Sequence, residues 1–151
     1  MPKPFRLQSV LDYRHSLVEA LEIELGRLHN EREQRLALLE NARARKTGLL
    51  TELGQAQTGA IDMTLIHQLR AALERQETSI AQQLQLLHKL QAAIEQKNRE
   101  TIAAKQDEEA LQTLKNKNEA LWQAELQLRE ARLQDDIYIA QAYRQASQIG
   151  R

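Results

Sequence analysis

Apolar residues recur along the first third of the chain at alternating steps of four and three residues. The repeat runs from Leu7 to Leu53, and basic side chains replace apolar ones at a few positions. A sustained repeat of this kind is typical of a coiled-coil seam, on which long basic side chains can lie while their charges reach water. The pattern predicts one helix over about residues 5–53. Its seam is Leu7, Leu11, Arg14, Val18, Leu21, Leu25, Leu28, Arg32, Arg35, Leu39, Ala42, Lys46, Leu49 and Leu53.

The segment GQAQTGAID, residues 54–62, interrupts this repeat. Two glycines bracket small polar residues, and Asp62 is a good N-cap for a following helix. A connection of about eight residues is enough to join neighbouring helices in a bundle. We therefore expect a tip at 54–61, a second helix over about 62–147, and a single antiparallel hairpin domain over 1–151.

The second helix carries apolar residues in two phases. Its first seam is Ile66, Leu69, Leu73, Gln76, Ile80, Gln83, Leu87, Leu90 and Ile94. Residues 95–109 are mostly polar, and a new seam follows in shifted phase. This second seam is Ala110, Leu114, Lys117, Leu121, Ala124, Leu128 and Ala131. A phase shift of this kind predicts a stutter, or a local unwinding of the supercoil.

The two helices differ in length. At ~1.5 Å per residue, the first spans roughly 70 Å and the second roughly 130 Å. Folding about the tip places Leu7 opposite about residue 107, so the rest of the second helix has no partner in its own chain. Folding back as a third helix would need a turn within 95–109, which has neither glycine nor proline. We therefore favour an overhanging C-terminal helix, whose exposed apolar stripe implies a binding partner.

Composition supports an all-α fold, a long antiparallel two-helix coiled coil. Aromatic residues make up 3% of the chain, and there are five glycines and two prolines. Basic and acidic residues number 21 each, so the net charge is zero and a nucleic-acid partner is not expected. Without cysteine, disulfides and thiolate metal sites are excluded. No apolar run approaches the ~18 residues of a membrane span, and no signal peptide is recognised, so we expect a cytoplasmic protein.

Catalytic motifs are missing from the sequence. It contains no phosphate-binding glycine loop, no nucleophile elbow and no metal-binding histidine pair. The carboxylates at 107–109 and 135–136 fit a solvated helix face, because a two-helix rod has no pocket that would shift their pKa values. We expect no enzymatic activity, no cofactor, no metal and no small-molecule ligand.

The aromatic residues gather near the two ends of the chain, at Phe5, Tyr13, Trp122, Tyr138 and Tyr143. Tryptophan and tyrosine are enriched at the hot spots of protein interfaces. These side chains therefore either pack the open end of the hairpin or anchor a partner.

Two terminal stretches resemble the FliJ family of flagellar protein-export components. The first is FRLQSVLDYR, residues 5–14, and the second covers residues 111–144. The resemblance covers the whole chain in architecture and is specific at its two ends. The matching residues are Phe5, Leu7, Leu11, Tyr13, Arg14, Leu111, Leu114, Lys115, Asp135, Asp136, Tyr143 and Arg144.

The resemblance implies a two-helix coiled coil similar to the stalk of rotary ATPases. It implies that the protein occupies the central pore of the hexameric flagellar export ATPase, couples it to the export gate in the membrane and contacts export chaperones. The location implied is cytoplasmic, peripheral to the inner membrane at the base of the export apparatus. The expected ATPase contacts are Phe5, Leu7, Leu11, Arg14, Leu121, Trp122 and Leu128. The expected gate or chaperone contacts are Arg43, Arg45, Leu49, Leu65 and Leu69.

Three alternatives stay open. Stalk proteins of virulence-type type III secretion systems share the same architecture. A structural coiled coil would instead self-associate through the unpartnered stripe and form a stable dimer or higher oligomer. A prefoldin-like holdase is disfavoured, because that family places strands between its helices and residues 54–62 have no room for them.

Overall fold

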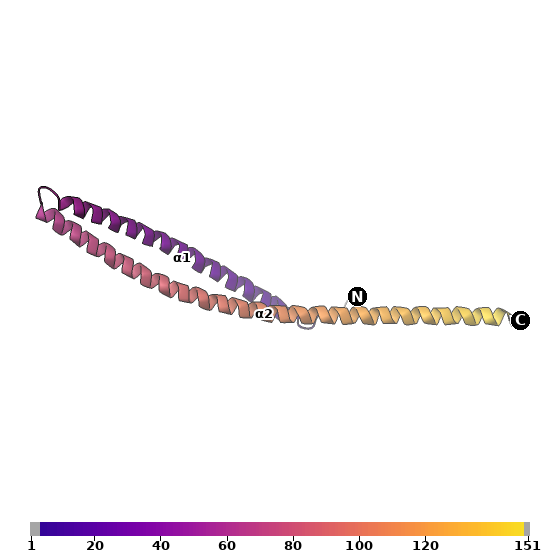
Figure 1. Cartoon of the computed structure of the whole chain (residues 1–151). Coiled ribbons are helices and arrows are strands. Elements are labelled where there is room, and N and C mark those ends of the chain that lie inside the picture. The colour runs from indigo at the N-terminus through magenta and orange to yellow at the C-terminus, as the bar shows by residue number, and fades with distance from the viewer. Residues whose placement is uncertain (1–3, 150–151) are drawn as a thin grey trace. The chain divides into compact units, whose positions relative to one another are not determined.

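The computed structural model describes residues 4–149, and these form two α-helices and no strand (Figure 1). Helix α1 spans Gln8–Ala56 and helix α2 spans Met63–Ile149. The all-α class is confirmed, with the two helices packed against each other. The predicted helix ranges, 5–53 and 62–147, end within three residues of the observed bounds.

Contacts divide the chain into two units, which we describe separately. The terminal unit combines Met1–Leu17 with Ala104–Arg151, of which we describe 4–17 and 104–149. The hairpin unit is Val18–Ala103. The single-domain organisation expected from the sequence stays a prediction.

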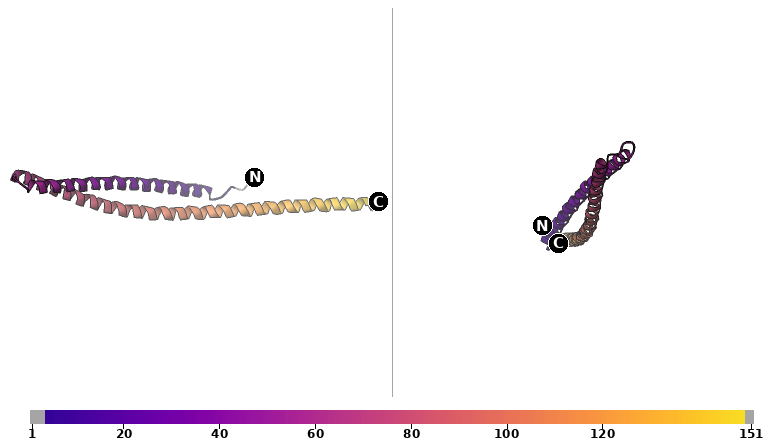
Figure 2. Two further views of the ribbon diagram at one scale, coloured as in Figure 1. Left: turned by 45° about the horizontal axis from the view of Figure 1, so that its top comes forward. Right: turned by 90° about the vertical axis from the view of Figure 1, so that its left-hand side faces the viewer.

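In the hairpin unit, α1 and α2 run side by side from the tip (Figure 2). Every position of the predicted α1 seam from Leu11 to Leu53 is buried or half-buried, and so is every position of the α2 seam from Ile66 to Ile94. Both seams are therefore confirmed. The most deeply buried apolar side chains of this unit are Val18, Leu39, Ala42, Ile66, Leu69 and Ile94.

The predicted stutter in α2 is wrong, because the buried stripe continues in one phase past residue 94. Its further positions are Lys97, Thr101, Ala104, Glu108, Leu111, Lys115 and Trp122. Thr101 is only 3% exposed, and its hydroxyl donates to the Lys97 carbonyl oxygen at 2.8 Å. A stripe of small and polar residues escapes a search for apolar periodicity.

Lys97 lies on the buried stripe, and its ammonium group forms ion pairs with two glutamates. Its Nζ lies 2.9 Å from Glu24 Oε2 and 3.1 Å from Glu100 Oε2. The hydrogen bonds to Glu24 and then to Glu100 raise the pKa of Lys97, and the bond from Lys97 lowers the pKa of Glu100. Lys97 contributes to the stability of the folded state until the pH rises through its raised folded pKa. Glu100 contributes to that stability until the pH falls through its lowered folded pKa. The cluster therefore stays charged across neutral pH.

The tip joins the helices through a left-handed glycine and an aspartate cap. Gly59 has φ +80°, and the Thr58 hydroxyl donates to the Gln55 carbonyl oxygen at 2.8 Å. Asp62 Oδ1 accepts from the backbone N–H groups of Thr64 at 3.0 Å and Leu65 at 3.5 Å. The predicted N-cap role of Asp62 is confirmed.

Two glycine substitutions are expected to change stability in opposite directions. Gly59→Ala should lower the free energy of unfolding by about 1 kcal/mol, because a Cβ disfavours positive φ. Gly48→Ala should raise it by about 1 kcal/mol, because this glycine lies inside α1 and an added Cβ meets no atom within 4 Å. Urea unfolding followed by circular dichroism measures both, and equal shifts of the same sign would contradict this account of the tip.

Candidate partner interface

The N-terminal segment, residues 4–15, packs on α2 within the terminal unit. A turn precedes α1, in which the Gln8 backbone N–H donates to the Phe5 carbonyl oxygen at 3.1 Å. Phe5 is half-buried, and Leu11, one turn into the helix, is only 5% exposed. The segment thus covers one side of α2 with apolar side chains.

An ion pair and an adjacent hydrogen bond connect this segment to α2. Arg14 Nη1 donates to Asp107 Oδ2 at 3.2 Å, and His15 Nδ1 lies 2.7 Å from Glu108 Oε1. The side chains of Arg14 and Asp107 are 37% and 59% exposed, so this pair fixes the register of the helices more than it stabilises them.

The register corrects an expectation from the sequence. Asp107 pairs with Arg14 rather than lying level with Leu7, a difference of one heptad. The reason is the position of the tip: the helices end and begin at Ala56 and Met63, so the fold turns a few residues later than a tip centred near residue 57 would.

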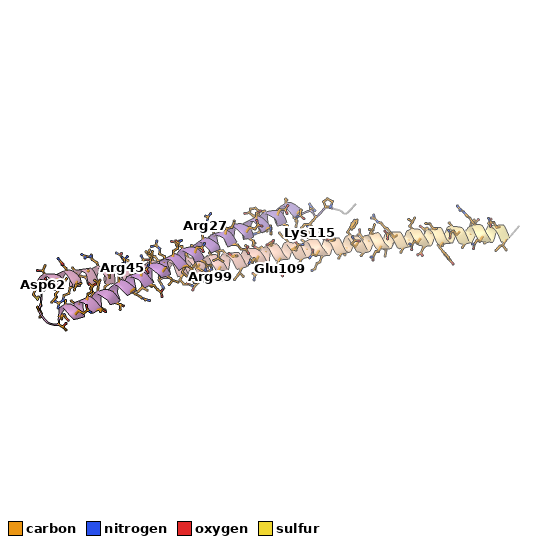
Figure 3. All side chains as sticks on the ribbon, turned by 90° about the horizontal axis from the view of Figure 1, so that it is seen from above. Arg27, Arg45, Asp62, Arg99, Glu109 and Lys115 are labelled. Carbon is orange, nitrogen blue, oxygen red and sulfur yellow. The ribbon has the colours of Figure 1, made fainter. Side chains whose placement is uncertain are left out.

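A cavity of about 480 Å³ lies where the N-terminal segment ends on α2. Phe5 and Trp122, two of the aromatic residues near the chain ends, both line it. Lys115, which Figure 3 labels, lines the same cavity. The remaining lining residues are Pro4, Arg6, Asn118, Glu119, Leu121 and Glu125.

Beyond this cavity, α2 continues to Ile149 with no second helix beside it among the residues that the structure describes (Figure 2). We call residues 126–149 the C-terminal extension. Apart from Leu126, which is half-buried, its large apolar side chains are at least half exposed: Leu128 55%, Leu133 60%, Ile137 50%, Tyr138 73%, Ile139 64%, Tyr143 77% and Ile149 85%.

These side chains lie on several sides of the helix. Successive residues of an α-helix point about 100° apart, so Ile137, Tyr138 and Ile139 together sweep about 200° of its circumference. Gln134 and Gln141 lie on a narrow polar sector of the helix, between the directions of Ile137 and Tyr138. Large apolar side chains on several sides of one helix favour a partner that contacts more than one of these sides.

The predicted ATPase-contacting residues therefore fall into three groups. Leu11 is buried and Arg14 is engaged with Asp107, whereas Leu121 is 64% exposed and Leu128 55%. The remaining members, Leu7, Phe5 and Trp122, lie at the cavity or on the segment beside it. Their contacts with a partner stay predictions.

The residues predicted to contact the gate or chaperones lie in the hairpin unit. Arg43 and Arg45 are exposed, and Leu65 is 43% exposed. Leu49 is half-buried, and Leu69 lies in the core at 7% exposure, which leaves its side chain little surface for a partner. These roles also stay predictions.

From the sequence, Asp107 and Glu108 were assigned to a solvated helix face, whereas both contact the N-terminal segment; Glu119, which lines the cavity, was not singled out. Asp107 and Glu108 each lie 93 residues from the basic side chain that they contact. Only a correct helix register brings such residues together. Opposite charges on the two helices were the available signal, once that register was known.

Metal and membrane sites were searched over the part of the chain that the structure describes. Among residues 4–149, no group of three His, Cys, Asp or Glu side chains is placed to hold a metal ion. Neither helix, over the same residues, is long and apolar enough to cross a membrane.

Two long helices paired over heptad seams define a coiled-coil protein. The family model described as Flagellar FliJ protein matches residues 2–147, so the chain belongs to the FliJ family. It is a flagellar export-related coiled-coil protein, and the resemblance noted at its two ends is confirmed. Comparisons with curated proteins and with solved structures find no match.

Proposed function

We propose that this protein is a stalk whose C-terminal extension inserts into the central pore of the hexameric flagellar export ATPase. The FliJ family assignment supports a role in flagellar export. The observation that carries the proposal is the exposure of Ile137, Tyr138 and Ile139, at 50%, 73% and 64%, on different sides of one helix. A ring that surrounds the helix covers all of these sides at once.

Self-association accounts for the same surface less well. In a two-stranded coiled coil, each helix buries one a/d stripe against its partner. A second copy would therefore cover part of the extension and leave other apolar side chains in water. The flagellar family assignment likewise favours the export ATPase over a virulence-type system.

The hairpin unit is the part that we propose couples the ATPase to the export gate and contacts export chaperones. Besides Arg43, Arg45 and Leu65, the surface around the tip exposes Ile61 at 60% and Met63 at 54%. Exposed apolar side chains flanked by charges suit protein contacts, and methionine adapts to varied partners. We place the protein at the cytoplasmic face of the inner membrane, without a cofactor and without catalytic activity of its own.

Removal of the extension tests this proposal. Deleting residues 133–151 should abolish stimulation of ATPase turnover and co-sedimentation with the hexamer, because the surface for the pore is gone. Urea unfolding of the shortened protein serves as the control, since the hairpin unit lies within Val18–Ala103 and should remain folded. Full stimulation by the shortened protein would contradict pore insertion.

A further inference from the structure

We infer that an apolar stripe of α2 over residues 110–131, the outer stripe, is a coiled-coil seam that pairs with the same stripe of a second copy of this chain. Its seven positions follow one another at alternating steps of four and three residues: Ala110, Leu114, Lys117, Leu121, Ala124, Leu128 and Ala131. All seven are exposed, with Leu114 at 41%, Leu121 at 64% and Leu128 at 55%. The heptad spacing is that of a seam, and among residues 4–149 no segment buries it.

The outer stripe lies on a different side of α2 from the N-terminal segment. That segment packs on the buried stripe, at Glu108, Leu111 and Trp122. Because successive residues of a helix differ by about 100°, the centres of the two stripes are roughly 110° apart around α2. Only Leu121 belongs to both the outer stripe and the lining of the cavity. The terminal unit can therefore keep its N-terminal segment in place while a second helix covers the outer stripe.

The extent of the stripe sets the expected strength of the pairing. One heptad beyond its outermost leucines stand Asp107 and Asp135, so the apolar surface ends on both sides. A stripe over residues 110–131 is ~33 Å long and ~10 Å wide, which covers roughly 330 Å² of each copy. Stable interfaces bury about 1,200 Å² or more in total. We therefore expect a weak dimer, with a dissociation constant on the order of 100 μM, rather than the stable dimer of a structural coiled coil.

The sizes of its side chains make the outer stripe complementary to itself. Leucines alternate with small alanines, and Lys117 replaces one alanine. In an antiparallel pair, each leucine of one copy faces an alanine or Lys117 of the other, so that large and small side chains fill the space between the helices evenly. Two registers give this match, in which Leu114 faces either Ala131 or Ala124. In both of them Lys117 faces a leucine, along which its aliphatic chain can lie while its charge reaches water.

A parallel pair of the same stripes fits less well. Each residue would face its own counterpart, so the alanines would face alanines and leave gaps between the leucine layers. The two copies of Lys117 would also face each other, and their like charges repel. The stripe therefore favours a second copy in the antiparallel direction.

Sedimentation equilibrium of the full-length protein tests the pairing. Between about 10 μM and about 1 mM, the average mass should rise from that of a monomer towards that of a dimer. Ala124→Glu places a large charged side chain in the seam and should weaken the dimer at least about tenfold. The matched control Gln123→Glu adds the same charge at a neighbouring exposed position off the stripe, and it should change the dissociation constant less than about twofold.

These outcomes decide the inference without reference to the ATPase. A mass that stays monomeric throughout, a mass that grows past the dimer, or equal losses from the two variants would each overturn it. Both substituted residues are exposed in the free chain, so neither change should unfold it. The dimer is a form of the free protein, so its absence would leave the proposed pore insertion untouched.

Disulfide exchange determines the direction of the pair, since the chain has no cysteine of its own. Leu114→Cys protein is mixed in a glutathione buffer with Ala131→Cys protein or with Ala124→Cys protein. Antiparallel pairing predicts, in one of the two mixtures, at least about twice as much mixed disulfide as both homodisulfides together. An excess of homodisulfides in both mixtures, or a mixed yield no higher than random assortment, would contradict the antiparallel pair.

Discussion

Replacing Ile137 and Ile139 together by aspartate is expected to abolish stimulation of the export ATPase and to weaken binding at least about 100-fold. The two side chains point to different sides of the extension and are 50% and 64% exposed in the free protein. Burying each one in a partner should contribute about 1.5 kcal/mol or more, and an unpaired charge there costs further free energy. The summed loss of binding free energy at the two positions exceeds the roughly 2.8 kcal/mol that corresponds to a hundredfold change in the dissociation constant. Titration calorimetry and turnover assays measure the two effects.

The matched control places the same charge on the polar sector. The double substitution Gln134→Asp with Gln141→Asp adds two carboxylates, each within one helical turn of Ile137 or Ile139. It should weaken binding by less than about tenfold, because glutamine already presents polar atoms there. Equal losses from both pairs would show that charge alone governs binding and would contradict the apolar docking surface.

Leu39→Ala should cause the largest loss of stability in the hairpin unit. Leu39 is only 4% exposed, in the seam between α1 and α2. Truncating a buried leucine removes its transfer free energy and leaves a cavity, at a cost of about 3 kcal/mol. Urea unfolding followed by the helical circular dichroism signal gives the change in the free energy of unfolding.

Leu38 provides the neighbouring comparison. It is 49% exposed, so Leu38→Ala should cost less than about 1 kcal/mol at the same place in the helix. A similar cost at both positions would mean that the register of α1 differs from the one described. The same pair tests the heptad assignment, because a one-residue shift would exchange the two effects.

The sequence predicted the fold where apolar residues mark the seam. The α1 seam from Leu11 to Leu53 and the α2 seam from Ile66 to Ile94 follow directly from heptad spacing. Leu7 is the exception, since α1 begins at Gln8 and Phe5 is the half-buried residue of the preceding turn.

The interface was harder to predict, because the buried stripe of α2 passes through Lys97, Thr101 and Glu108. Each of these is buried or half-buried and has a polar partner: a carboxylate, a carbonyl oxygen or an imidazole. Such partners come from the tertiary structure and leave no periodic apolar signal. The sequence therefore assigned Leu121 and Leu128 to the seam, and the structure shows both exposed.

A photo-crosslinking scan of the assembled complex tests the central claim most directly. A photoreactive residue is introduced in turn at Ile137, Tyr138 and Ile139, which point about 100° apart around the helix. Enclosure by the pore predicts crosslinks to the ATPase from all three positions. Crosslinks from only one of them, or to a second copy of this chain instead of the ATPase, would contradict it.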